Sequence, residues 1–301
     1  MQGLKIGHFT QAAYGTGLSV FLFEKPAAGA YLIAGSGPAS HELAPLEPEM
    51  SVPVVHALML SGGSAYGLFA AKGVMQFLTE QGMGLPVPHG IVPIVPAACI
   101  YDLAYKKPEP PRAEDAYAAC LAAKENNTES GRIGAGTGAT VGKIIPQAKH
   151  MTAGIGRAEI VLPNGVAVLA YVVVNAVGDV RDQHNNILAG ARMQTGEFGD
   201  CMQFLLSGKG EEILFPHANT TLAAIFTNAK FSKSELKRIT KMAVAGMARA
   251  IAPVFTCYDG DILFSFSIGE KTASAMAVGN MAAEAVRLAI IDAVKETEIV
   301  N

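Results

Sequence analysis

Residues 166–174 form an almost unbroken apolar run, and this run constrains the fold more than any other feature of the chain. Successive side chains of a strand point to opposite sides of a sheet, so a strand that is apolar throughout must be covered on both faces. The chain therefore needs further layers around this strand. With 301 residues, half of them apolar, it can bury a sizeable core in one large domain or two small ones.

Other short β-rich runs alternate with stretches of helical periodicity. Strands are predicted at residues 18–23, 54–60, 166–174, 222–227 and 262–268, and helices at residues 64–81, 113–125, 232–252 and 272–296. Ser232 with Glu235 three positions later is a capping-box pattern that marks a helix start, and Pro253 marks its end. Residues 184–219 are weakly periodic and predict a long mobile segment. The interspersed elements predict one α/β domain of stacked layers over residues 1–301.

The composition argues against several classes of function. The net charge is −3, and no basic cluster is interleaved with aromatic residues, so there is no electrostatic case for nucleic acid or an anionic membrane as partner. The first residues lack the apolar core of a signal peptide. The most apolar region, near residues 272–294, carries Glu284, Arg287 and Asp292, which predicts a buried helix and not a membrane span. We therefore expect a cytoplasmic protein.

The cysteines and histidines form no metal-binding pattern. Cys99, Cys120, Cys201 and Cys257 are widely spaced, and we expect reduced thiols packed as small apolar groups. The seven histidines are scattered, and none pairs with another ligand at metal spacing. We expect no metal and no other cofactor. An enzyme built on this chain would need a base other than histidine.

Two glycine-rich stretches approach known motifs without matching them. Residues 134–139 fit the dinucleotide fingerprint, but no apolar strand precedes them, and residues 138–143 are one residue short of a P-loop. Gly62, Gly63 and Ser64 resemble a serine nucleophile elbow whose last glycine comes one position late. Spacing alone favours tight turns. The alternative is close approach of the backbone to a substrate or a cleaved terminus, which makes these three residues candidates for substrate binding.

The step from Asn219 to Thr220 directly precedes the strand predicted at residues 222–227. It is either a plain turn or a bond that the protein cuts in itself. If the bond breaks, Thr220 becomes a new chain start, and its hydroxyl lies beside a free α-amine. Such an amine has an ordinary pKa of about 8, so it can act as a base near neutral pH without a histidine.

Asp259, Gly260 and Asp261 lead into the last predicted strand. Two acids around one glycine form either a solvated turn, which is the commoner case, or a carboxylate pair beside Thr220. In the second interpretation one carboxylate holds the α-ammonium group or accepts the hydroxyl proton, and the other orients it. Two adjacent carboxylates would raise the pKa of the amine, so burial or a compensating cation is needed. Lys143 is a candidate for that cation.

Several segments in order resemble one known family. They are residues 60–67 (LSGGSAYG), 95–102 (VPAACIYD), 134–143 (GAGTGATVGK), 172–180 (VVVNAVGDV), 218–222 (ANTTL), 225–229 (IFTNA) and 259–264 (DGDILF). Together they resemble the self-cleaving peptidase family of the L-aminopeptidase/D-Ala-esterase and the β-peptidyl aminopeptidases. The threonine at the cut site and the Asp-Gly-Asp pattern are most similar to its endo-type 6-aminohexanoate-oligomer (nylon-oligomer) hydrolases.

The resemblance implies a fold and a role for each matching residue. The fold would be a four-layer αββα sandwich of the N-terminal-nucleophile type, and the chain would be cut into residues 1–219 and 220–301. Thr220 would be the nucleophile, with Asp259 and Asp261 positioning it. Tyr101 and Asn175 would line the oxyanion site, and Lys143 would lie near the nucleophile. The resemblance and the high apolar content also favour a homo-oligomer of cleaved units.

The sequence therefore predicts a self-processing amidohydrolase or aminopeptidase. Thr220 would first attack the carbonyl of Asn219 and then, as a new N-terminus, the amide of a substrate. Two alternatives stay open: an acyltransferase similar to ornithine acetyltransferase, and an uncleaved binding protein on the same scaffold. The substrate amide is also open, between peptides, β-peptides, amides of D-residues and nylon-like oligomers.

Overall fold

The computed structural model describes residues 1–209 and 219–300. Its largest sheet is linked through one long strand, β2 (Thr16–Ile33), which belongs to two layers at once. The first half of β2 pairs with β1 and β4, and its second half pairs with β17. The register with β4 shifts between Leu22 and Ala27, where the strand passes from one layer to the other.

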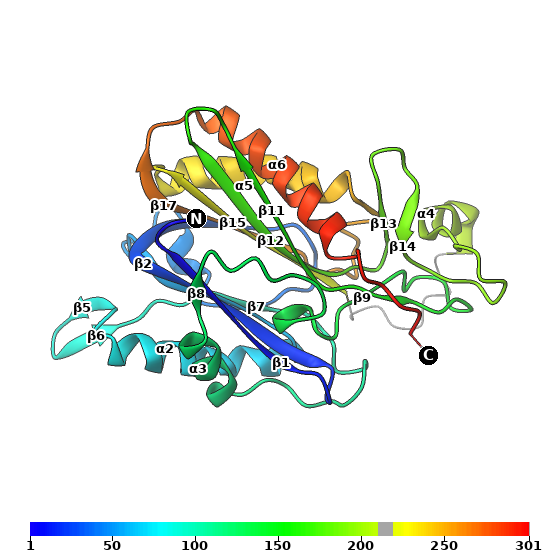
Figure 1. Cartoon of the computed structure of the whole chain (residues 1–301), viewed down its shortest axis with the longest axis horizontal. Coiled ribbons are helices and arrows are strands. Elements are labelled where there is room, and N and C mark those ends of the chain that lie inside the picture. The colour runs from blue at the N-terminus through cyan, green and yellow to red at the C-terminus, as the bar shows by residue number, and fades with distance from the viewer. Residues whose placement is uncertain (210–218, 301) are drawn as a thin grey trace.

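The upper layer in Figure 1 contains the strand that the apolar run predicted. Its strand order is β11 (Ile155–Val161), β12 (Ala167–Asn175), β15 (Thr220–Ala229), β17 (Ile262–Lys271) and the second half of β2. Within it, β15 is antiparallel to β12 and parallel to β17. Every residue of β12 is buried, as its composition requires.

The lower layer is built around the first half of β2. It contains β8 (Lys124–Glu125), β1 (Leu4–Gln11), β4 (Val55–Ser61), β7 (Ala97–Cys99) and β3 (Ala39–His41). Phe21 and Phe23 point from β2 toward the upper layer, where Phe21 meets Phe226 with ring centroids 5.2 Å apart. Leu18 and Val20 point the other way, into a second core under the helices. The alternation along β2 thus supplies both cores.

Helices cover the outer face of each layer, as Figure 1 shows. Helices α5 (Lys233–Ala248) and α6 (Ala275–Asp292) pack on the upper sheet, and α2 (Ala71–Glu80) and α3 (Ala113–Leu121) on the lower one. The order of layers is helix, sheet, sheet, helix, which confirms the four-layer αββα prediction. No helix of the described residues is long and apolar enough to cross a membrane.

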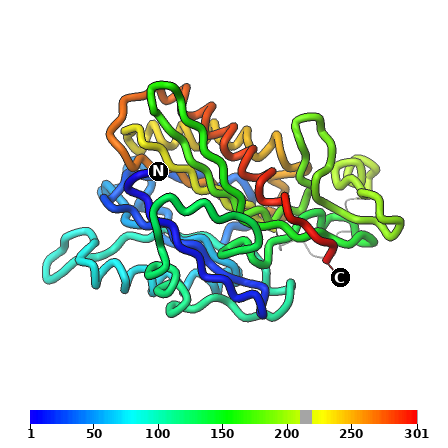
Figure 2. Tube along the Cα trace, in the orientation of Figure 1, coloured from blue at the N-terminus to red at the C-terminus, as the bar shows by residue number. Residues whose placement is uncertain are grey.

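The smaller elements lie around this frame. They are β5 (Leu85–Val87), β6 (Gly90–Val92), β9 (Thr140–Val141), β10 (Met151–Thr152), β13 (Asp179–Arg181), β14 (Ile187–Ala189), β16 (Ile251–Ala252), α1 (Ser64–Gly67) and α4 (Cys201–Phe204). Short 3-10 turns occur at Ala44–Leu46, Leu68–Ala70 and Gly134–Gly136, and a π turn at Leu205–Lys209. Near the C-terminus, Ile299 bridges to Met151, so the chain end lies along β10 (Figure 2).

Several predicted boundaries differ from the structure. The helix predicted at residues 64–81 is interrupted by the 3-10 turn, and the helix predicted at 113–125 ends early because β8 pairs with β1. The helix predicted at 232–252 ends at Ala248, since β16 pairs with β13. The segment predicted to be long and mobile contains β14 and α4; its residues 210–218 lie outside the described residues.

Cys99, Cys120 and Cys201 are buried free thiols as predicted, whereas Cys257 is exposed.

Candidate active site

The candidate site forms where β15 begins, between its two neighbouring strands. Thr220, the first residue of β15, is paired in register with Asn175, the last residue of β12. On the other side Asn219 forms a parallel bridge with Asp259, just before β17. The sheet therefore brings together three segments that are far apart in the sequence, and it buries them: Thr220 is 5% exposed and Asp259 is 1% exposed.

The bond between Asn219 and Thr220 is the centre of this arrangement. The Thr220 hydroxyl donates a hydrogen bond to the Asn219 carbonyl oxygen over 2.5 Å. The same oxygen accepts a second hydrogen bond, of 2.8 Å, from the backbone N–H of Gly260. The hydroxyl that the sequence singled out thus lies against the peptide group that it would attack.

Both carboxylates of the Asp-Gly-Asp segment are buried beside this bond. Asp261 accepts a hydrogen bond of 2.5 Å from the Thr221 N–H, and Asp259 accepts bonds from the N–H (2.8 Å) and the hydroxyl (2.7 Å) of Thr256. Burial, together with the neighbouring Asp259 carboxylate, raises the pKa of Asp261 to about 8. Burial also raises the pKa of Asp259. These carboxyl groups therefore hold protons more readily than exposed ones do.

Lys143 reaches the same site from the loop after β9. Its Nζ donates to the backbone oxygen of Asn175 over 3.0 Å and to Asn175 Oδ1 over 2.9 Å. Burial lowers the pKa of Lys143 to about 7, although Asp259 and Asp261 act in the opposite direction. Near neutral pH Lys143 therefore exists in both its charged and its neutral form.

Asn175 and Tyr101 are joined directly. Asn175 Nδ2 donates to the Tyr101 backbone oxygen over 3.1 Å, while Asn175 Oδ1 accepts from the Thr140 N–H over 3.1 Å. Asn175 is 1% exposed, and Tyr101 is half-buried at the end of the segment that follows β7. These contacts connect both residues to the start of β15 through the pairing of Asn175 with Thr220.

The glycine turn at residues 62–64 contacts Asp102, the neighbour of Tyr101. The Gly63 N–H donates to Asp102 Oδ1 over 2.7 Å, and a Cβ on Gly62 would lie 2.0 Å from Asp102 Oδ2. Gly63 and Ser64 both have positive φ, at 85° and 54°. The turn that the spacing favours is therefore present, and the group it approaches is a buried side chain of the protein. A role of Gly62, Gly63 and Ser64 in substrate binding stays a prediction.

Two contributors to the site were not identified from the sequence. Asp102 is 3% exposed and also accepts a 2.7 Å hydrogen bond from the Thr16 hydroxyl, so it holds the segment of Tyr101 in place. From the sequence Gly260 is only the residue between two acids, because a backbone N–H leaves no signature in the sequence. For Asp102, the sequence offers one indication, its position next to Tyr101 in the segment at residues 95–102.

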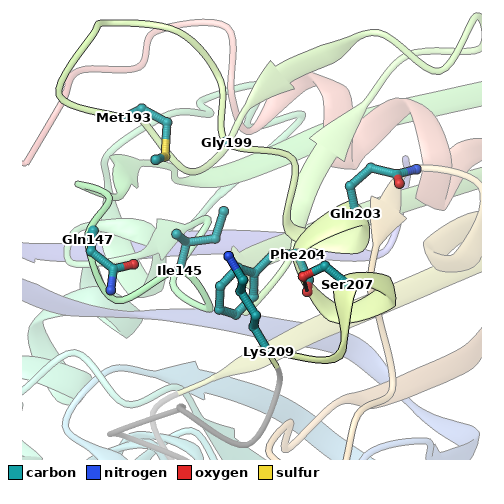
Figure 3. A pocket seen from close by; sticks show the side chains of 8 residues that line it. All are labelled: Ile145, Gln147, Met193, Gly199, Gln203, Phe204, Ser207 and Lys209. Carbon is teal, nitrogen blue, oxygen red and sulfur yellow. Dashed lines mark hydrogen bonds between the residues drawn. The ribbon is translucent and has the colours of Figure 1, made fainter.

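A cavity of about 460 Å³ opens next to the Lys143 segment (Figure 3). Ile145, two residues after Lys143, is part of its lining and of a small apolar cluster with Val177, against which Phe204 packs. The lining combines apolar side chains with amide, hydroxyl and ammonium groups: Ile145, Gln147, Met193, Gly199, Gln203, Phe204, Ser207 and Lys209. Apolar walls with a few polar groups are typical of a small-molecule site.

Within the part of the chain that the structure describes, no group of three or more His, Cys, Asp or Glu side chains is arranged to hold a metal ion. The chemistry available at the site is that of a hydroxyl, two carboxyls, an amine and oriented amides. Such a set can activate a hydroxyl nucleophile and stabilise a tetrahedral oxyanion.

Comparison with known proteins gives a consistent result. The model of peptidase family S58 matches residues 1–301. An uncharacterized aminopeptidase of Mycobacterium leprae (strain TN) is 34% identical over 302 residues, covering 92% of this chain and 80% of the relative. A 6-aminohexanoate-oligomer endohydrolase of Kocuria sp. (strain KY2) is 32% identical over 257 residues, covering 80% of this chain and 72% of the relative.

Solved structures share the fold. A β-aminopeptidase of Burkholderia sp. superposes with a TM-score of 0.70 at 18% identity, covering 97% of this chain and 84% of that one. The L-aminopeptidase D-Ala-esterase/amidase of Ochrobactrum anthropi, described as a variant of the Ntn hydrolase fold, also gives 0.70, at 15% identity and the same coverage. The prediction of an N-terminal-nucleophile-type architecture is thereby confirmed.

Proposed function

The chain belongs to peptidase family S58 and is a hydrolase of peptide or other amide bonds, and we propose that it cuts its own Asn219–Thr220 bond and then works through Thr220. The observation that carries this proposal is the 2.5 Å contact between the Thr220 hydroxyl and the Asn219 carbonyl oxygen. It holds a nucleophile against one particular peptide bond inside a buried site.

Self-cleavage would proceed by transfer of an acyl group from nitrogen to oxygen. Thr220 Oγ1 attacks the carbonyl carbon of Asn219, and its proton passes to the neighbouring group of Lys143, Asp259 and Asp261. The C–N bond then breaks, the Thr220 nitrogen takes up a proton, and an ester joins Asn219 to the Thr220 oxygen. One water molecule hydrolyses this ester, which leaves a carboxylate on Asn219 and a free α-amine on Thr220.

The mature site would repeat this chemistry on a substrate. The Thr220 α-amine or the nearby lysine accepts the hydroxyl proton, the oxygen attacks a substrate amide, and the amine product leaves with a proton. Water then releases the acyl group. Tyr101 and Asn175, joined through their 3.1 Å hydrogen bond, are proposed to line the oxyanion site of this second reaction. Asp259 and Asp261 are proposed to position Thr220.

Substitution of Thr220 tests the proposal. On a denaturing gel the wild-type chain should give two bands, for residues 1–219 and 220–301, and Thr220→Ala a single band without amidase activity. Thr220→Ser retains a hydroxyl and should give two bands. An uncleaved wild-type chain that hydrolyses amides would contradict the mechanism.

The substrate class is proposed from the cavity and the relatives. The relatives named above are an aminopeptidase and a hydrolase of 6-aminohexanoate oligomers, and the cavity lined by Ile145 offers both apolar and polar contacts. We propose that the substrate is a short peptide or linear oligoamide whose chain continues from the scissile bond into this cavity. A homo-oligomer of cleaved units remains a prediction.

Truncation of Phe204 tests the role of the cavity. Phe204→Ala removes an apolar contact from the lining and should raise KM for a long oligoamide about tenfold, with little change for a dimer that ends near the scissile bond. Leu206→Ala is the matched control, because Leu206 is 72% exposed and does not line the cavity. Equal effects of Phe204→Ala on long and short substrates would contradict the assignment.

A further inference from the structure

We propose that the backbone N–H of Gly260 stabilises the oxyanion that forms on the Asn219 carbonyl oxygen during self-cleavage. The inference rests on the proposed self-processing and assigns a chemical role to a group that has no side chain. It also proposes that residues 34–37 hold Gly260 in position for this step.

The Asn219 carbonyl oxygen accepts two hydrogen bonds. One donor is the Thr220 hydroxyl, at 2.5 Å, and the other is the Gly260 N–H, at 2.8 Å. When the Thr220 oxygen attacks, it gives up its proton and stops donating. Of these two donors, the Gly260 N–H is the one that still donates while negative charge grows on the carbonyl oxygen. Its distance lies within the range of about 2.7–3.1 Å that effective oxyanion donors have.

The side chain of Asn175 has a different partner in the same structure. Asn175 Nδ2 donates to the Tyr101 backbone oxygen, whereas the Asn219 oxygen accepts from Gly260. We assign a separate donor to each of the two acyl transfers. Gly260 serves the carbonyl of the chain itself, and Asn175 with Tyr101 serves the substrate.

Residues 34–37 fix the segment of Gly260 from the side opposite Asn219. The N–H groups of Ser36 and Gly37 donate to the Asp259 backbone oxygen over 2.7 and 3.0 Å. Those of Ala34 and Gly35 donate to the Asp261 backbone oxygen over 2.9 and 3.1 Å. Gly260 is thus held between two anchored residues, so its N–H needs no reorganisation when charge develops.

Two glycines make this close packing possible. A Cβ on Gly35 would lie 2.3 Å from the Asp259 backbone oxygen and 2.5 Å from the Asp261 nitrogen, so a side chain there must displace the segment. A Cβ on Gly260 would lie 2.7 Å from Thr220 Oγ1. Gly37, in contrast, has no atom within 4 Å of the position that its Cβ would take. Gly35 is therefore a positioning residue, and Gly37 offers a matched control.

The direct test replaces the Gly260 N–H with an ester oxygen, which is of similar size and cannot donate a hydrogen bond. Glycolic acid is incorporated at position 260 of the full chain by in vitro translation with a charged suppressor tRNA, and cleavage of the newly made chain is followed on a denaturing gel. We expect self-cleavage to be slowed by about 100- to 1000-fold relative to wild type. A rate within threefold of wild type would overturn the role of Gly260. A wild-type chain that never cleaves would instead refute the proposed function.

The positioning role of residues 34–37 is tested by a double substitution. Gly35→Ala should slow self-cleavage at least tenfold, and Gly37→Ala should leave it within twofold of wild type. If Gly35 acts through the Gly260 N–H, Gly35→Ala should add little to the slowing that glycolic acid at 260 already causes. Multiplicative effects of the two changes, or equal slowing by Gly35→Ala and Gly37→Ala, would show that the segment affects the fold in general and would overturn the positioning role.

Discussion

Burial shifts the pKa values of the charged residues at the site. Burial raises the pKa of Asp261 to about 8 and lowers that of Lys143 to about 7, so groups whose pKa values are far apart in water titrate in the same range here. Near neutral pH the cluster can therefore take a proton from the Thr220 hydroxyl and return one to the leaving nitrogen.

The pH dependence of self-cleavage follows from the lowered pKa of Lys143. Above pH 7 the amine is mostly neutral and can accept a proton, and below pH 7 it is charged and cannot. We expect the rate of self-cleavage to fall about tenfold per pH unit below 7, as for any single required base. Lys143→Met should lower the rate about 100-fold and remove this dependence.

The control for this substitution is Lys241→Met, at an exposed position on α5, which should leave the pH profile unchanged. The measurement is the first-order rate of band conversion in buffers from pH 5 to 8. A wild-type rate that is constant across this range would contradict the role given to Lys143.

Helix α5 is stabilised at its start by hydrogen bonds between residues that are close in sequence. The Ser232 N–H donates to the Glu235 carboxylate over 2.8 Å, and the Ser232 hydroxyl accepts from the Glu235 N–H over 3.4 Å, which completes the capping box. Helix α6 also begins after a serine, Ser274, but that side chain makes no capping hydrogen bond. The two helix starts therefore form a natural pair for comparison.

Removal of each serine hydroxyl should have unequal effects. Ser232→Ala should lower the free energy of unfolding by about 1 kcal/mol, because it leaves an N–H at the start of α5 without its partner. Ser274→Ala should change it by less than about 0.5 kcal/mol. Urea unfolding in the uncleaved Thr220→Ala background measures both. Equal losses from the two substitutions would contradict the capping assignment.

The same elements show what a sequence can and cannot predict. The start of α5 was predicted to within one residue, because its signal lies in neighbouring side chains. The ends of α3 and α5 were wrong because β8 and β16 pair with strands distant in sequence. Strand β2 was predicted over only a third of its length, since its crossing between two sheets breaks the simple apolar pattern.

The candidate site divides along the same line. Six candidate residues could be predicted because their side chains lie in recognisable sequence segments: Thr220, Asp259, Asp261, Lys143, Asn175 and Tyr101. The structure brings those segments together at one end of β12, β15 and β17. The roles of the Gly260 N–H and of residues 34–37 could not be predicted, because every residue type except proline carries the same backbone groups. Only the tertiary structure determines which partner each backbone group bonds to.

The whole molecule holds the two expected fragments together. Strand β15 follows the proposed cut and lies inside the sheet between β12 and β17, while α5 and α6 cover the same face. Residues on both sides of the cut share one apolar core, including Tyr171, Phe21 and Phe226. Cleavage of one peptide bond at the edge of this core removes none of these contacts.

The cleaved protein should therefore stay assembled without denaturant. We expect residues 1–219 and 220–301 to elute together in size-exclusion chromatography of the native protein and to separate only in denaturing conditions. The uncleaved Thr220→Ala chain is the control and should elute at the same volume. Separation of the fragments in native buffer would contradict this description of the core.

Thr220 is proposed to become both the new chain start and the acyl carrier. Intact-mass spectrometry tests it most directly, on purified wild-type protein and on a sample quenched in acid during hydrolysis of an oligoamide. We expect two species with the masses of residues 1–219 and 220–301, and in the quenched sample an added acyl mass on residues 220–301 alone. A single species of 301 residues, or an acyl group on residues 1–219, would contradict it.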